Sequence, residues 1–188
     1  MFNRRYRNEY KIVTDEATGK EKIIYIGSYY RFELSEEGKK ARTRLYIILL
    51  VMILLLFAGG ALINNVGSRI MYVMVPYAIA VFPVAYLTMG VVRTALERGD
   101  MEHIAYDCTV TRIRKSTVGI MAFMGISFAG DMVLIIGNSE LVDMTRELLF
   151  AATTLMIGGL CFYFRKQNLK YKCVPVENKR LQENEKHN

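Results

Sequence analysis

Residues 45–63 read LYIILLVMILLLFAGGALI, nineteen residues without a charged side chain. At about 1.5 Å of rise per residue, a helix of this length matches the roughly 30 Å thickness of a bilayer's hydrocarbon core. Three more apolar runs, of 22, 19 and 17 residues, follow at 71–92, 118–136 and 148–164. The four runs predict an all-α integral membrane protein, with a four-helix transmembrane domain at residues 35–164.

The basic residues are distributed unevenly between the segments that join these runs. Residues 1–44, 93–117 and 165–188 hold 11, 5 and 7 Lys or Arg, whereas the two other loops hold one each, Arg69 and Arg146. This asymmetry, 23 against 2, predicts that both termini and the central loop are cytoplasmic and that the protein sits in the plasma membrane. The first run follows 44 mostly polar residues, so we expect it to remain in the mature protein rather than act as a signal peptide.

Basic side chains next to the cytoplasmic ends of the spans are expected to contact lipid headgroups of the inner leaflet. They are Lys39, Lys40, Arg42, Arg44, Arg112, Arg114, Lys115, Arg165 and Lys166. Insertion topology and an anionic inner leaflet already account for the net charge of +7. The charge is therefore no indication of nucleic-acid binding.

The segment before the membrane, residues 1–34, carries a β-hairpin pattern. Lys11–Thr14 and Lys22–Tyr25 are rich in β-branched and aromatic residues, and they flank a polar turn with a glycine. A lone hairpin is marginally stable. We therefore expect it to pack on the bundle, on a partner or on residues 170–176.

Several local signals mark the helix boundaries. Ser35 is a candidate N-cap for the helix that leads into the first span. Pro76 and Pro83 each remove a backbone donor from the second span and predict a kink there. Residues 97–116 favour a short amphipathic helix on the inner surface, with a strand as the alternative. The tail, residues 165–188, is charged towards its end and is expected to be partly disordered.

The chain also shows a weak internal similarity. Arg42 and Arg44 precede Arg112 and Arg114 by 70 residues, and two FAG triplets lie 71 residues apart. Because both copies enter the membrane from the cytoplasm, this pattern indicates two tandem helical hairpins related by an axis along the membrane normal. A chance match is the alternative, because the second helix of each pair hardly matches.

One carboxylate, Asp131, falls inside an apolar run. It lies five residues from the outer end of the third span, about 7 to 8 Å into the hydrocarbon. A carboxylate at the bilayer centre costs roughly 2.5 to 3.5 kcal/mol, so this residue should have a partner or water. Candidates at the same depth, with two arginines that could reach down as counter-ions, are Tyr77, Thr153, Thr154, Arg69 and Arg146. This intramembrane polar cluster is either a proton or cation site or an interhelical hydrogen bond.

The rest of the chain offers no catalytic set. No nucleophile motif, P-loop or metal-ligand spacing occurs, so we predict a non-enzymatic protein without metal or cofactor. The predicted function is that of an accessory or assembly subunit, whose cytoplasmic face docks a membrane or cytoplasmic protein or a second copy of the chain. The alternative is a small oligomeric transporter or channel that uses Asp131. Compactness and the absence of Asn-x-Ser/Thr favour a bacterial source.

Overall fold

A computed structural model describes residues 4–14, 21–97, 101–137, 140, 143–171 and 173–176. The turn predicted around Gly19 and the predicted disordered end of the tail lie outside these residues. The described residues contain four helices that are long and apolar enough to cross a membrane by length and composition, as the sequence predicts.

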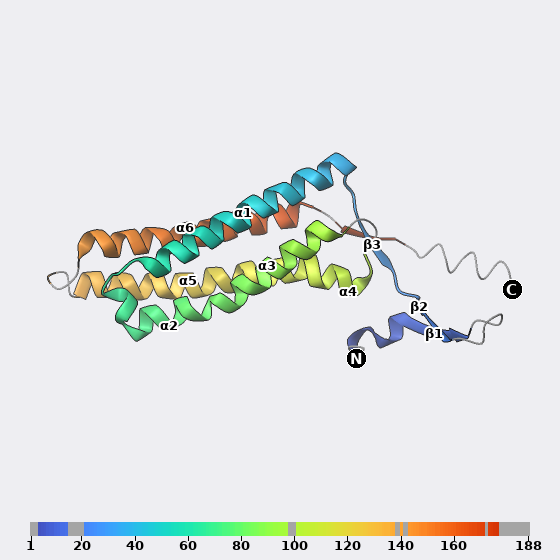
Figure 1. The fold of residues 1–188 in the computed structure, drawn as a ribbon, viewed down its shortest axis with the longest axis horizontal. Coiled ribbons are helices and arrows are strands. Elements are labelled where there is room, and N and C mark those ends of the chain that lie inside the picture. The colour runs from blue at the N-terminus through green and yellow to red at the C-terminus, as the bar shows by residue number, and fades with distance from the viewer. Residues whose placement is uncertain are drawn as a thin grey trace.

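The four helices lie side by side as an elongated bundle (Figure 1). The first is α1 (Glu36–Leu62), the second consists of α2 (Met71–Ile79) and α3 (Val81–Leu96), and the last is α6 (Met144–Lys170). The third begins with α4 (His103–Tyr106), continues through the π-helical turn η3 (Asp107–Thr111) and becomes α5 (Arg112–Gly137). Helix α5 packs against α6, α2 and α3, while α1 packs against α6 and α3. In the predicted segment 97–116, the residues from His103 onward are therefore helical rather than a strand, and they continue into the third span.

The second helix is interrupted between its two prolines, as predicted. Helix α2 ends at Ile79, α3 begins at Val81, and Ala80 between them is fully buried. Pro83 has no N–H to donate to the carbonyl of Ile79, and its ring displaces that carbonyl from the helical path. In the predicted duplication, α6 corresponds to this second helix, but α6 has no such break. The duplication of a helical hairpin therefore stays a prediction.

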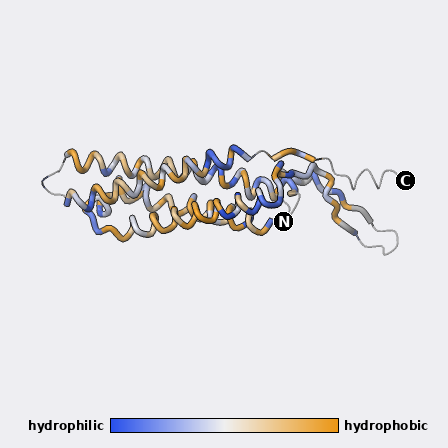
Figure 2. Tube along the Cα trace, turned by 90° about the horizontal axis from the view of Figure 1, so that it is seen from above, coloured by the Kyte–Doolittle hydropathy of each residue, from blue (hydrophilic) through white to orange (hydrophobic). Residues whose placement is uncertain are grey.

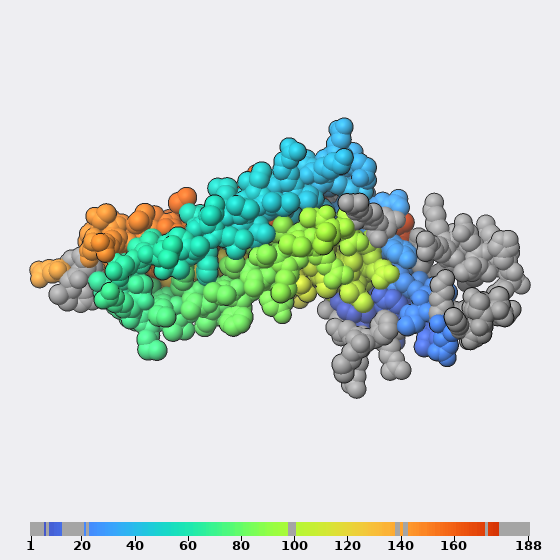
Figure 3. Space-filling view, in the orientation of Figure 1, coloured from blue at the N-terminus to red at the C-terminus, as the bar shows by residue number. Residues whose placement is uncertain are grey.

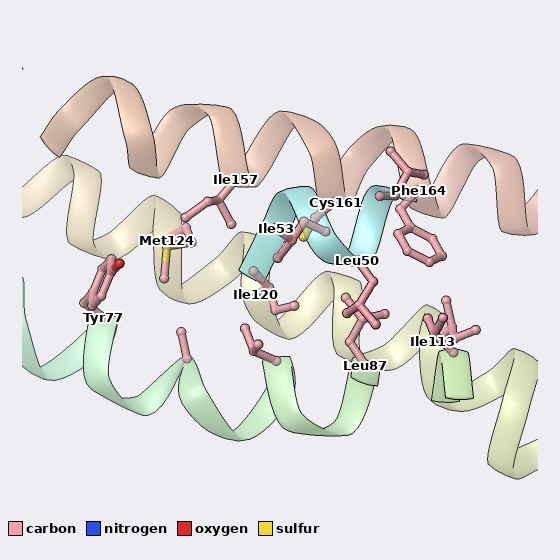
Figure 4. Close-up of a cluster of buried hydrophobic side chains, with 14 of the residues drawn as sticks. Leu50, Ile53, Tyr77, Leu87, Ile113, Ile120, Met124, Ile157, Cys161 and Phe164 are labelled. Atoms are coloured by element: carbon pink, nitrogen blue, oxygen red, sulfur yellow. The ribbon is translucent and has the colours of Figure 1, made fainter. Parts of the chain in front are cut away.

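The core runs along the bundle axis (Figure 4). Ile53, Leu87, Ile120 and Ile157 come from four different helices and expose none of their surface. The outer surface is also apolar: Leu55 and Phe82 are 68% and 69% exposed, and hydrophobic residues continue along the helices in Figure 2. An apolar surface of this extent is unusual in water and fits a location in lipid.

Two small sheets lie at one end of the bundle, which we call the sheet end (Figure 1). After a short 3-10 turn, η1 (Arg4–Glu9), β1 (Tyr10–Thr14) and β2 (Glu21–Tyr25) form the predicted antiparallel hairpin. The next strand, β3 (Tyr29–Phe32), pairs antiparallel with β4 (Cys173–Val176), which follows α6. Within the predicted stretch 170–176, Cys173–Val176 therefore pair with the strand after the hairpin rather than with the hairpin itself.

Ser35 caps α1 as predicted, since its Oγ accepts from the backbone N–H of Gly38 at 3.2 Å. The opposite end of the bundle, which we call the loop end, contains residues 63–70 with the 3-10 turn η2 (Gly67–Arg69). The end of α5 and the start of α6 lie at the same end, where Asp143 caps α6 by accepting from the N–H of Arg146.

Candidate functional site

Two carboxyl side chains are completely buried at the loop end. Asp131 projects from α5 and Glu147 from the first turn of α6, and neither exposes any of its surface. They meet Asn65 and Gly67 from the segment between α1 and α2, both of which are also buried. We call these four residues the carboxyl cluster.

Glu147 is fully provided with hydrogen-bond donors. Its Oε1 accepts from the backbone N–H groups of Val66 and Gly67 at 2.7 and 3.1 Å, and its Oε2 accepts from Asn65 Nδ2 at 2.5 Å. Ser68 completes the turn by donating through its hydroxyl to the carbonyl of Asn65 at 2.7 Å. Three donors to one carboxyl group fasten the α1–α2 segment to α6.

Asp131 has the opposite environment. Neither of its carboxyl oxygens accepts a hydrogen bond from any residue the structure describes. The group that faces it is the Glu147 carboxyl, close enough for a side-chain hydrogen bond when one of the two carries a proton. A Cβ on Gly67 would lie 2.6 Å from Asp131 Oδ1 and 3.0 Å from Glu147 Oε2, so these oxygens are separated by less than the sum of the two distances. Glycine at position 67 leaves the space that this approach requires.

The hydroxyl groups predicted to surround Asp131 bind elsewhere. Tyr77 Oη donates to the carbonyl of Phe57 at 2.5 Å, and Thr153 and Thr154 donate to carbonyls of their own helix at 2.8 Å. Serine and threonine on helices commonly bond back to the preceding turn, which satisfies the hydroxyl without a tertiary partner. These three residues therefore do not form a cluster with Asp131.

The predicted counter-ions also lie elsewhere. Arg69 donates to Asn64 Oδ1 at 3.0 Å, and Arg146 pairs with Asp143 at 3.1 Å and donates to the Asn64 carbonyl at 3.1 Å. Both arginines are exposed. At the surface they bind these acceptors without losing their hydration, whereas a buried position beside Asp131 would require their desolvation. The carboxyl cluster thus has no cationic partner among the described residues.

Two close contacts place α2 beside this cluster. Ser127, one turn before Asp131, donates its hydroxyl to the carbonyl of Val73 at 3.0 Å. The carbonyl of Tyr72, which Pro76 leaves without its helical donor, lies 3.2 Å from the position of a Cβ on Gly130. Helices also approach closely at Gly60, where a Cβ would lie 2.6 Å from Tyr77 Oη.

Glu147 is the residue that the sequence analysis missed. Its position in an acidic loop-like stretch suggested exposure, but it lies in helical register with three apolar or hydroxyl residues that are also buried. These residues, three, four and seven positions later, are Phe150, Ala151 and Thr154. A helix stripe of this spacing faces the core, so the register was the signal that predicts burial of Glu147.

The basic residues at the sheet end fall into two groups. Lys39, Lys40 and Arg44 border a groove of about 630 Å³ between α1 and α3, whose apolar lining includes Ile47 and Ile48. Figure 3 shows α1 and α3 next to each other on one face of the bundle. Of the other expected lipid contacts, Lys115 and Lys166 are exposed, while Arg112, Arg114 and Arg165 are half-buried.

Arg42 is an exception to the expected lipid contacts. It is 5% exposed, and its guanidinium lies 3.6 Å from the centre of the Phe32 ring. The face of an aromatic ring attracts a cation, and Phe32 holds the side chain inward in this way. The prediction that Arg42 contacts lipid is therefore wrong.

Hydrogen bonds connect the hairpin to α4. Tyr25 Oη donates to the Ser28 carbonyl at 2.9 Å and accepts from the N–H of His103 at 3.1 Å, and Glu9 Oε1 lies 2.7 Å from His103 Nδ1. Burial is the main reason that the pKa of Tyr25 rises to about 12, so its hydroxyl stays protonated at neutral pH. Tyr10 adds a second connection by donating to Glu102 at 2.7 Å.

The described residues contain no group of three or more His, Cys, Asp or Glu side chains arranged to hold a metal ion. Comparison of the chain with protein-family models, curated proteins and solved structures gives no match. The geometry of the chain itself is therefore the basis for a functional proposal.

Proposed function

We propose that this chain is a non-enzymatic multi-pass protein of the plasma membrane, an accessory or assembly subunit that docks a partner protein through its sheet end. Four long apolar helices with an apolar outer surface support a location in the membrane. The distribution of 23 basic residues against 2 supports a cytoplasmic sheet end. Both described sheets lie at that end, where a cytoplasmic or membrane partner would meet them.

The observation that carries this proposal is a pair of exposed isoleucines on the hairpin. Ile12 and Ile23 are cross-strand partners and are 62% and 51% exposed. The two strands pair only with each other among the described residues, so the sheet also offers open edges for an added strand. Because hydrogen bonds hold the hairpin against α4, this apolar pair is presented in a fixed position, which lowers the entropy cost of binding.

Replacing both isoleucines by threonine tests the proposal. Threonine keeps the preference for a strand but removes the apolar contact, so we expect partner recovery to fall about tenfold or more. The measurement is the mass and composition of the protein purified gently from its native membranes at natural abundance. Lys11→Thr is the matched control, because Lys11 lies on β1 beside Ile12 and is also exposed. Undiminished recovery from the double variant, or a wild type that carries no foreign subunit, would contradict docking.

A small oligomeric transporter or channel is the second candidate, and the buried carboxyl pair of Asp131 and Glu147 favours it. For that function, Asp131→Asn should abolish a pH-dependent flux in vesicles, while deletion of residues 1–34 should change the flux little. Docking predicts the reverse sensitivity for partner recovery. Neither candidate requires a metal, a cofactor or a nucleic acid.

A further inference from the structure

We infer that Asp131 and Glu147 form a proton-binding site. One proton resides on Asp131, and the resulting O–H donates a hydrogen bond to the Glu147 carboxylate. This assignment does not depend on docking, since it concerns the loop end and the ligand is a proton. It follows from three features of the carboxyl cluster: the burial of both side chains, the unequal supply of donors, and the absence of a cation.

The donors decide which carboxyl group is ionised. Glu147 accepts three N–H groups, from Asn65, Val66 and Gly67, and this arrangement suits a carboxylate. Asp131 receives none from the described residues although both its oxygens are buried. An ionised Asp131 would be a buried charge without donors beside a second negative charge, and both circumstances oppose ionisation.

One proton resolves both difficulties. When water at the loop end delivers a proton to Asp131, an O–H bond forms on that carboxyl group and its charge is neutralised. The new O–H then donates a hydrogen bond to the facing Glu147 carboxylate, so that the two carboxyl groups attract rather than repel each other. Release of the proton reverses these changes and leaves two negative charges in contact.

The charged and titratable groups on the surrounding elements have other partners and do not contact this pair. On α6, Asp143 and Arg146 bind each other at the surface, and Arg69 from η2 binds Asn64. Helix α2 contributes Tyr72, whose ring faces Gly130 rather than a carboxyl group. On α5 itself, the nearest polar side chain is Ser127, which donates to the carbonyl of Val73.

Proton release would act on the segment between α1 and α2. The donors that hold Glu147 all belong to this segment, so any movement of Glu147 away from an ionised Asp131 would strain or break their hydrogen bonds. The site therefore links the pH on the loop-end side to the attachment of the α1–α2 turn.

Infrared spectroscopy of the full-length protein in lipid bilayers tests the proton directly. A protonated carboxylic acid has a C=O stretching band that carboxylates lack and that shifts in heavy water. We expect the wild type to show this band at neutral pH and to lose it as the pH rises. Asp131→Asn should lose the band while keeping the unfolding temperature, because the Asn amide donates to Glu147 as the acid does. Asp143→Asn, an exposed control that still caps α6, should keep the band.

A second variant keeps the test decisive if Asp131→Asn fails to fold. Glu147→Gln removes the negative charge that faces Asp131 but leaves Asp131 buried, so the band should disappear at a lower pH than in the wild type. A wild type without the band at neutral pH would overturn the proton assignment, even if another cation occupied the site. Survival of the band in Asp131→Asn, or its disappearance at the same pH in Glu147→Gln as in the wild type, would overturn it as well.

Discussion

Glu147→Ala is expected to lower the free energy of unfolding by about 3 to 5 kcal/mol, because it removes the acceptor of three hydrogen bonds in a buried site. The N–H of Gly67 and the amide of Asn65 are buried and would lose their partner without regaining water. An unsatisfied buried donor costs about 1 to 3 kcal/mol, and at least two are created together. The α1–α2 turn should separate from α6 first.

Thermal or denaturant unfolding in a mild detergent measures this loss, and hydrogen exchange of the Val66 and Gly67 amides locates it. Glu140→Ala is the matched control, since Glu140 is also a glutamate at the loop end, between α5 and α6, but is exposed. Its removal should change stability by no more than about 0.5 kcal/mol. Equal effects of the two alanine variants would show that Glu147 has no special role in holding the loop end together.

The sequence predicted the elements that depend on local composition. The lengths of the apolar runs were sufficient for the four helices, and β-branched residues were sufficient for the β1–β2 hairpin. Pro76 and Pro83 located the break at Ala80, since their effect on backbone hydrogen bonds is local.

The site was predicted only in part. Asp131 was singled out by the cost of its position, and the structure buries it completely. Its neighbours depend on helix rotation, which charge counting does not report. Thr153 and Thr154 lie at the expected depth and are buried, yet their hydroxyls bond within α6. Glu147 was not singled out, because it is charged and directly precedes the predicted fourth span, residues 148–164. A buried charge is rare enough that composition alone favours exposure.

Arg42 was misread for the same reason at the other end of the bundle. A long basic side chain near the end of a span usually extends to the headgroups. Here three aromatic rings, of Phe32, Tyr46 and Tyr171, lie 3.6, 5.7 and 5.8 Å from its guanidinium carbon. Phe32 belongs to β3 and Tyr171 follows α6. The β3–β4 pairing, which the sequence did not predict, brings these two rings to Arg42.

Arg42→Glu is therefore expected to destabilise the sheet end by about 3 kcal/mol or more, whereas Arg44→Glu should change stability by about 0.5 kcal/mol or less. The first variant loses a cation–π contact of about 2 kcal/mol and places a carboxylate against the negative face of the Phe32 ring. The second makes the same charge change two residues further along α1, at an exposed position.

The measurement is unfolding of both variants in the same detergent, with hydrogen exchange of the β3 and β4 amides as the local readout. If lipid contact alone explained both arginines, the two charge reversals would have equal effects, because both residues would lie at the same interface. Faster exchange in β3 and β4 for Arg42→Glu alone would instead identify Arg42 as the side chain that fastens this sheet to α1. Arg42→Met separates charge from volume: it keeps an apolar chain against Phe32 without a buried charge, so it should be less destabilising than Arg42→Glu.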